Sequence, residues 1–139
     1  MFRRIVIASD GSEGAGYALS AAIRLAKEHH AVLQLVSVEE LPQFPASVDE
    51  IIEEKTTADH FYKGVASRAM AQAQAEGVKL ATHLLSGHAV KTIVEFVQRE
   101  RADLLVVGYM GHSAVYNRII GSTTDRLVEL APCAVLVIK

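Results

Sequence analysis

Short apolar segments alternate with longer amphipathic ones along the whole chain, and this alternation constrains the fold more than any other feature. Five segments rich in Val, Ile, Leu and Ala have the length of strands: 4–8, 31–38, 78–85, 104–107 and 134–138. Four segments repeat apolar residues every three or four positions, as amphipathic helices do: 14–30, 48–76, 89–101 and 125–131. The strands are mostly apolar on both faces, so they need helices on both sides. The pattern predicts an α/β protein with a three-layer, open, mostly parallel five-stranded sheet.

Turn-forming residues mark the ends of these predicted elements. Pro42 and Pro45 lie in segment 39–47 and predict a loop there. Gly77 follows the second helix at the position where a left-handed glycine commonly ends a helix. No internal repeat, low-complexity segment or linker interrupts the 139 residues, and this length suits one ordinary domain. We therefore expect residues 1–139 to form a single domain.

The composition excludes several classes of protein. Half of the residues are hydrophobic and 22% are charged, as in soluble globular proteins. The formal net charge of −2 gives no sign of the basic surface that binds nucleic acid or an anionic membrane. No apolar run approaches the roughly 20 residues of a membrane span, and Asp10 interrupts the apolar start too early for a secretory signal. The single cysteine, Cys133, cannot form an internal disulfide, which fits a cytoplasmic location.

The segment from Gly108 to Thr124 carries the clearest functional pattern. It runs Gly-Tyr-Met-Gly, then nine residues, then Gly-Ser-Thr-Thr, and it joins a predicted strand to a predicted helix. Glycines let a backbone approach a ligand closely, and N–H groups and hydroxyls at a helix start attract anions. The spacing predicts a phosphate-binding loop. The alternative is that the glycines only turn the chain and the hydroxyls only cap the helix.

Asp10 directly follows the first predicted strand, in the sequence Asp10-Gly11-Ser12. Ligands of open parallel sheets bind beyond the carboxyl ends of the strands, at the point where the strand order reverses. If the first and fourth strands are neighbours there, Asp10 and the glycine segment share one crevice. The alternative for Asp10 is a structural role, because Asp-Gly-Ser also forms a stable turn.

These motifs, with the C-terminal run Ala131-Pro132-Cys133-Ala134-Val135-Leu136-Val137, resemble the universal stress protein family over essentially the whole chain. The resemblance is to the subgroup with a Gly-x2-Gly-x9-Gly-Ser nucleotide-binding pattern. It implies a Rossmann-like fold with strand order 3-2-1-4-5, ATP with Mg²⁺ as ligand, and a nucleotide-dependent sensor or regulatory module of the stress response. It also implies a homodimer, and the apolar edge strand Ala134–Ile138 is where we expect two copies to pair.

The resemblance also implies a role for individual residues of the binding site. Residues bordering the nucleoside would be Ala8, Ser9 and Asp10, and the backbone of Val38 would meet the adenine. Two glycines would flank the phosphates, and a glycine and hydroxyl run would bind them: Gly108, Gly111, Gly121, Ser122, Thr123 and Thr124. One departure is that Tyr109 and Met110 stand where the family often has a small or basic residue. Arg118 is then the nearest cation that could contact phosphate.

An enzyme is the main alternative to a regulatory protein. ATP pyrophosphatases and nucleotidyl transferases of the related adenine-nucleotide hydrolase group share this architecture, but their loop Ser-Gly-Gly-x-Asp-Ser differs from the segment 9–14 here. No Gly-Lys-Ser/Thr of a P-loop is present, and the six histidines follow no metal-ligand spacing. We expect no catalytic or metal-binding residues, and slow ATP hydrolysis at most. An interaction scaffold without a ligand is the third alternative.

Overall fold

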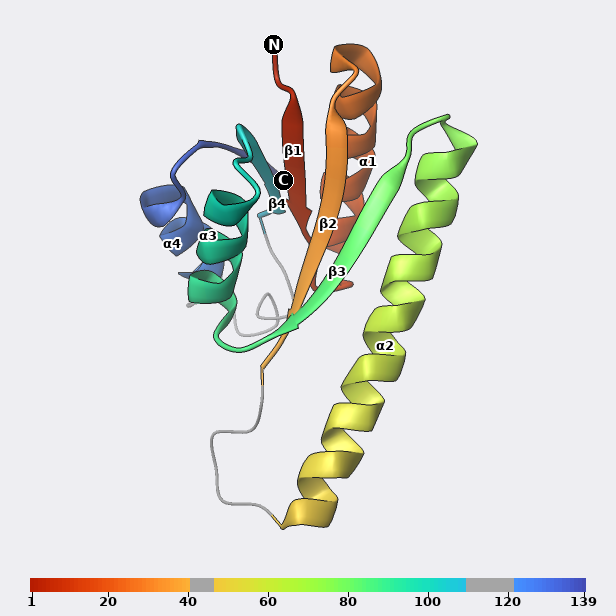
Figure 1. Ribbon diagram of the computed structural model, residues 1–139, viewed down its shortest axis with the longest axis vertical. Helices are drawn as coiled ribbons and strands as arrows, with labels where there is room; N and C mark the ends of the chain where they lie inside the picture. Colours follow the sequence, from red (N-terminus) through yellow and green to blue (C-terminus); the bar gives the residue numbers. More distant parts are fainter. Residues whose placement is uncertain (41–46, 110–121) are drawn as a thin grey trace.

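The structure is a computed structural model that describes residues 1–40, 47–109 and 122–139. Within these residues, five parallel strands form one sheet and four helices cover its two faces (Figure 1). The elements in chain order are β1 (Arg4–Ala8), α1 (Glu13–His29), β2 (Val32–Glu39), α2 (Val48–Ala75), β3 (Leu80–Ser86), α3 (Ala89–Arg99), β4 (Leu104–Gly108), α4 (Ser122–Leu130) and β5 (Ala134–Ile138). The order across the sheet is β3-β2-β1-β4-β5. The predicted α/β class and the implied strand order are both confirmed.

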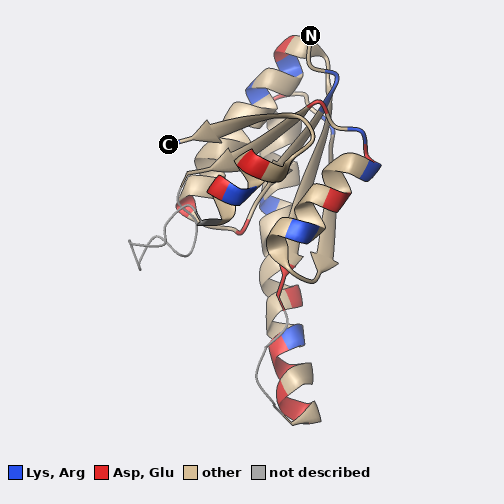
Figure 2. Ribbon diagram, turned by 90° about the vertical axis from the view of Figure 1, so that its left-hand side faces the viewer, with Lys and Arg blue, Asp and Glu red and all other residues tan. Residues whose placement is uncertain are grey.

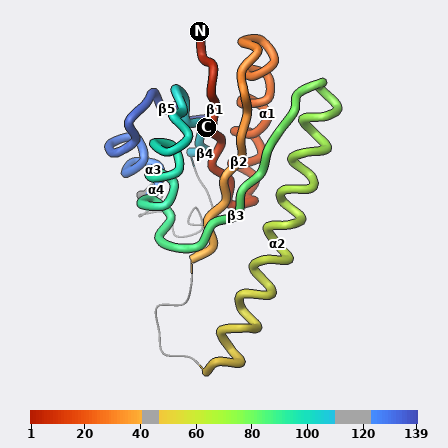
Figure 3. The backbone as a smooth tube through the Cα atoms, in the orientation of Figure 1, coloured from red at the N-terminus to blue at the C-terminus, as the bar shows by residue number. Residues whose placement is uncertain are grey.

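The middle strand, β1, sends alternate side chains into two apolar clusters. Ile5 and Ile7 pack in the cluster that includes α1 and α2, and Val6 packs in the cluster that includes α3 and α4. These three side chains are at most 1% exposed. The tube in Figure 3 shows α1 and α2 on one side of the sheet and α3 and α4 on the other. Burial on both faces explains why the strands are apolar without alternation.

The boundaries of the elements differ from the predicted ones by a few residues. β2 continues into the predicted loop, because Glu39 still pairs with Ser86 of β3. α4 begins at Ser122 rather than at residue 125, since its polar first turn has no apolar stripe that would reveal it. Gly77 has a φ of 74°, which confirms the left-handed glycine after α2. Pro42 and Pro45 lie outside the described residues.

Helix α2 has two halves with different surroundings. Its C-terminal half packs on the sheet through Val65, Ala69 and Ala73, which are buried. Its N-terminal half projects beyond the carboxyl ends of the strands (Figure 1), and residues 48–57 are all exposed. Acidic residues gather on this projecting half (Figure 2). Because of such charges even this long helix is not a membrane span, and none of the helices in the described segments is long and apolar enough to be one.

Gly11 lets α2 approach the turn that follows β1. Its φ of +79° lies in the left-handed region, which non-glycine residues adopt at a cost of about 1–2 kcal/mol. A Cβ atom there would lie 2.6 Å from Cζ of Phe61 and 2.8 Å from Cγ2 of Val65. Glycine at this position therefore serves both the conformation of the turn and its contact with α2.

We predict that Gly11→Ala lowers the free energy of unfolding by about 1–2 kcal/mol, from the left-handed backbone alone, and by more if Phe61 must move. The matched control is Gly16→Ala. Gly16 lies within α1 with open space around the missing Cβ, so alanine there should stabilise the fold by about 0.5–1 kcal/mol. Urea denaturation of both variants measures the difference. Equal stability of the two variants would contradict this role of Gly11.

Candidate functional site

A cleft of about 340 Å³ opens at the carboxyl ends of β1, β2 and β4, a size typical of small-molecule sites. β1 and β4 are neighbours in the sheet, and Asp10 and Gly108, at the ends of these two strands, both line the cleft, as expected. Residues from all four helices complete the walls. The described lining is Ala8, Ser9, Asp10, Ser12, Ala15, Val36, Val38, Glu40, Tyr62, Ala89, Ile93, Val107, Gly108, Tyr109, Thr123, Thr124 and Leu127.

The cleft exists because β1 ends before β2 does. Ala8, the last residue of β1, lies opposite Val36, whereas β2 continues to Glu39 paired only with β3. The N–H of Ser9 donates to the carbonyl of Val36 at 3.0 Å, so the main-chain groups of Val36 face the β1 side. Main-chain directions repeat every second residue along a parallel strand. The N–H and C=O of Val38 therefore face the space beyond the end of β1.

One part of the cleft is apolar and continuous with the core. Its walls come from the sheet and from the two helices, α3 and α4, that cover the same face. The residues are Ala8, Val36, Val38, Ile93, Val107 and Leu127. These side chains come from strand ends and from helix faces that meet there. An apolar slot beside exposed main-chain groups suits a flat heteroaromatic ring with polar edges.

The rest of the cleft is polar and lies at the start of three helices. The lining includes Ser12 and Ala15 at the start of α1, Ala89 at the start of α3, and Thr123 at the start of α4. Ser12 caps α1, with its hydroxyl accepting from the N–H of Ala15 at 3.2 Å. Helix N-termini carry partial positive charge, and this favours anionic groups of a ligand.

Three of the predicted residues, Asp10, Gly108 and Thr124, also have structural roles. Oδ1 of Asp10 accepts a hydrogen bond from the N–H of Ser12 at 2.9 Å. Asp10 therefore stabilises the turn, as the alternative predicted, and also lines the cleft. The hydroxyl of Thr124 donates to the carbonyl of Gly108 at 2.9 Å. A Cβ atom on Gly108 would lie 2.8 Å from the backbone of Gly14. Gly108 therefore permits β4 and α1 to pack closely.

The structure brings most of the predicted site residues to this cleft. Those in the lining are Ala8, Ser9, Asp10, Val38, Gly108, Thr123 and Thr124. Ser122 is the first residue of α4, while Gly111 and Gly121 lie outside the described residues, as do Met110 and Arg118. Contact of any of these residues with a ligand stays a prediction. Sequence analysis did not predict the other lining residues, among them Glu40, Tyr62, Ala89 and Ile93. Of these four, only Glu40, two positions after Val38 and directly after the end of β2, had a signal that could have found it.

The charged side chains in the described lining are both acidic. Glu40 accepts from the N–H of Ala89 through Oε1 at 2.9 Å and so caps α3, whose N-cap His88 makes no side-chain cap bond. Asp10 is the second carboxylate. The lining has no Lys or Arg within the described ranges, and no group of three or more metal-ligating side chains occurs in them either.

A buried carboxylate beside the cleft ties α2 to the sheet. Glu39 is 4% exposed, and its Oε1 accepts from Nζ of Lys55 at 2.8 Å and from the hydroxyl of Ser86 at 2.9 Å. Burial by itself would raise the pKa of Glu39, but hydrogen bonds from Lys55 and Ser86 outweigh it and hold the pKa below the ordinary 4.5. The ionised carboxylate is therefore the form that the fold favours.

Comparison with known proteins agrees with this geometry. The model of the universal stress protein family matches residues 1–139. The chain belongs to this family. A universal stress protein of Methanocaldococcus jannaschii is 31% identical over 147 residues, covering 100% of this chain and 83% of the relative.

Solved structures of the family have the same fold. The universal stress protein UspA from Lactobacillus plantarum superposes with a TM-score of 0.90 at 25% identity, covering 99% of this chain and 98% of the other. The universal stress protein from Archaeoglobus fulgidus in complex with dAMP has a TM-score of 0.68 at 26% identity, covering 99% of this chain and 98% of the other. At least one related chain of this fold thus holds an adenine nucleotide.

We predict that Glu39 makes stability depend on pH in the acid range. Because its folded-state pKa lies below 4.5, its stabilisation is complete above that value and is lost as the pH falls through the lower, folded-state value. As the pH is lowered from about 7 to about 3, the unfolding free energy of the wild type should therefore decrease relative to that of Glu39→Gln. The control is Glu76→Gln, which removes an exposed ion pair with Lys27. A difference that is independent of pH would contradict the prediction.

Proposed function

We propose that the cleft binds an adenine nucleotide, ATP with Mg²⁺, and that the protein is a nucleotide-dependent sensor or regulatory module of the stress response. The observation that carries the proposal is the main chain of Val38, which faces the cleft beside an apolar slot. Adenine presents an amino donor next to a ring nitrogen acceptor. A backbone C=O and N–H at one position complement this edge, while the apolar walls cover the ring faces.

The polar part of the cleft suits the ribose and the phosphates. Asp10 can accept hydrogen bonds from ribose hydroxyls. Thr123 lies in the first turn of α4, and we propose that Ser122, Thr123 and Thr124 bind phosphate with Gly121, while Gly108 and Gly111 flank it. Mg²⁺ would offset the negative charge of ATP beside the carboxylates of Asp10 and Glu40.

The family supports an adenine nucleotide as the class of ligand. The related Archaeoglobus fulgidus protein is in complex with dAMP. This chain contains the Gly-x2-Gly-x9-Gly-Ser pattern of the nucleotide-binding subgroup that it resembles. We propose that the 139 residues act as one nucleotide-binding domain in the cytoplasm.

We also propose that the protein holds nucleotide without efficient turnover. Catalysis of phosphoryl transfer requires a positioned base and cations at the reacting phosphate. Apart from two tyrosines, the ionisable groups in the described lining are Asp10 and Glu40. Asp10 accepts a hydrogen bond from the N–H of Ser12 in its turn, and Glu40 accepts one from the N–H of Ala89 at the start of α3. Holding ATP rather than consuming it fits a regulatory module.

We predict that the protein binds ATP·Mg²⁺ and that Asp10→Asn weakens binding about tenfold, because a hydrogen bond to a charged group contributes about 1.5–3 kcal/mol. Asparagine retains the acceptor for the N–H of Ser12, so the turn is preserved. Isothermal titration calorimetry measures the affinity. A control is Asp49→Asn, on the exposed first turn of α2, which should bind ATP as the wild type does.

Two results would contradict the proposal. No heat and no thermal shift of the wild type with millimolar ATP·Mg²⁺ would favour a scaffold without a ligand. Phosphate release from the same samples at about 10 per second, the median rate of enzymes, would favour an ATP-hydrolysing enzyme.

The edge strand β5 supports a second proposal, that two copies pair into a homodimer. β5 lies at the end of the sheet and pairs with β4 on one side. Its residues Ala134–Ile138 are all apolar, and each is partly or fully exposed in the single chain. An apolar edge with unpaired main-chain groups is a liability that soluble proteins cover. Pairing across a twofold axis would cover it in both copies.

We predict a solution mass of twice 15.0 kDa by light scattering at micromolar concentration. Val137→Pro removes one main-chain donor from β5 and should shift the mass toward that of one chain. Circular dichroism shows whether the variant keeps its helices. A monomeric wild type would refute the dimer, and a dimer that survives in a folded Val137→Pro variant would place the interface elsewhere.

A further inference from the structure

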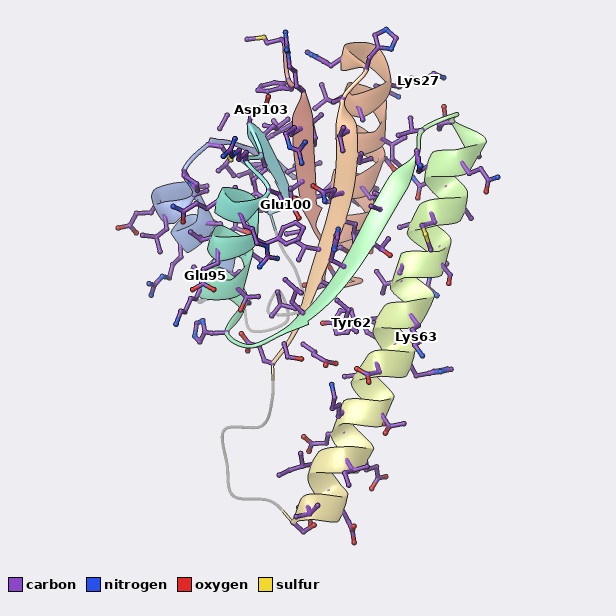
Figure 4. The ribbon with its side chains drawn as sticks, viewed as in Figure 1. Lys27, Tyr62, Lys63, Glu95, Glu100 and Asp103 are labelled. Atoms are coloured by element: carbon purple, nitrogen blue, oxygen red, sulfur yellow. The ribbon has the colours of Figure 1, made fainter. Side chains whose placement is uncertain are left out.

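Tyr62 brings helix α2 into the cleft, although α2 begins well away from it. It is the one α2 residue in the described lining. Figure 4 shows its side chain directed from α2 toward the carboxyl ends of β2 and β3, whereas the neighbouring Lys63 points away from the sheet. Figure 4 shows the ring at the level where α2 leaves the sheet, three positions before Val65, the first buried residue of α2.

The turn that carries Asp10 packs against this same part of α2. The absent Cβ of Gly11 leaves room for Phe61 and Val65, which lie on either side of Tyr62 in the chain. The rings of Phe61 and Tyr62 meet edge to face, with centroids 5.0 Å apart. Tyr62 is therefore held by packing next to the turn Asp10-Gly11-Ser12, and its position does not depend on a hydrogen bond.

The hydroxyl of Tyr62 is available to a ligand. Among the residues that the structure describes, it has no hydrogen-bond partner, although the side chain is half-buried. Burial raises the pKa of Tyr62, and the negative charges of Asp10, Glu39 and Glu40 raise it further. The phenol is therefore protonated at neutral pH and can donate as well as accept.

We propose that Tyr62 is a ribose-binding residue, which together with Asp10 makes the cleft select nucleotides with free ribose hydroxyls. This inference rests on the proposed nucleotide-binding function. A carboxylate can only accept hydrogen bonds, whereas a phenol can donate one. A ribose diol offers both donors and acceptors, so Asp10 accepts from one hydroxyl while Tyr62 donates to the oxygen of the other. Tyr62 thereby adds a contact from α2 to a site otherwise built by strand ends and helix starts.

The test compares two ligands on two proteins. Tyr62→Phe keeps the ring and its packing and removes only the hydroxyl. Titration with ATP·Mg²⁺ should show affinity about 3- to 10-fold weaker than that of the wild type, the range expected for one neutral hydrogen bond. Titration with 2′,3′-dideoxy-ATP·Mg²⁺ should give the same affinity for both proteins, because that ligand lacks the hydroxyls that Tyr62 would contact.

The control variant is Tyr17→Phe, which removes an exposed phenol that donates to Glu13 at 2.9 Å on α1. It should bind both ligands as the wild type does. Thermal unfolding without ligand should be the same for Tyr62→Phe and the wild type, because the hydroxyl has no partner within the described part of the chain. This measurement separates a ligand contact from a structural role.

Three outcomes overturn the inference. ATP affinity unchanged in Tyr62→Phe would remove the hydroxyl from the site, while nucleotide binding by the wild type would leave the proposed function standing. Equal losses for ATP and dideoxy-ATP would show that Tyr62 acts on the site as a whole and not on the sugar. No binding of either ligand to the wild type would overturn the proposed function and this inference with it.

Discussion

The pairing of β1 with two neighbours is the interaction on which the rest of the structure depends. β1 lies between β2 and β4, and its side chains alternate between the two apolar clusters on opposite faces of the sheet. Burial of Ile5, Val6 and Ile7 holds helices of both layers against one strand. Its early end at Ala8 leaves the main chain of Val38 facing open space. The same strand thus organises the core and creates the cleft.

Helix α2 joins the architecture to the site in a second way. Half of it is an ordinary core helix, and half projects beyond the sheet as an acidic, exposed segment. The junction between the halves lies where Gly11 admits Phe61 and where Lys55 reaches the buried Glu39. Tyr62 belongs to this junction. The position of α2 and the shape of the cleft are therefore set by the same contacts.

The electrostatics of the cleft combine two opposing contributions. The first turns of α1, α3 and α4 provide partial positive charge and favour an anion. The carboxylates of Asp10 and Glu40 favour hydrogen-bond donors or a cation. A nucleotide with a metal ion has all of these features: hydroxyl and amino donors, phosphate oxygens and positive charge. Neither a simple anion nor a simple apolar molecule would complement the whole cleft.

The sequence by itself determined the fold class and nearly every element. The periods of apolar residues depend only on neighbours a few positions apart, and a parallel sheet needs strands that are apolar on both faces. Within the residues that the structure describes, those local rules located each strand and helix to within a few residues. They missed polar ends such as the first turn of α4 and the end of β2. Asp10 and Gly108 were also visible, because each lies at or just beyond the end of an apolar strand.

Only the tertiary structure decided which of these residues share the cleft. Asp10 and Gly108 face each other because β1 and β4 are neighbours, an order that the chain's own periodicity does not reveal. Tyr62 looks like any other residue on a helix stripe until α2 is packed over the turn at Gly11. Glu40 becomes part of the cleft only when α3 begins beside it. Such contacts join segments far apart in the chain, and they depend on packing that no local pattern encodes.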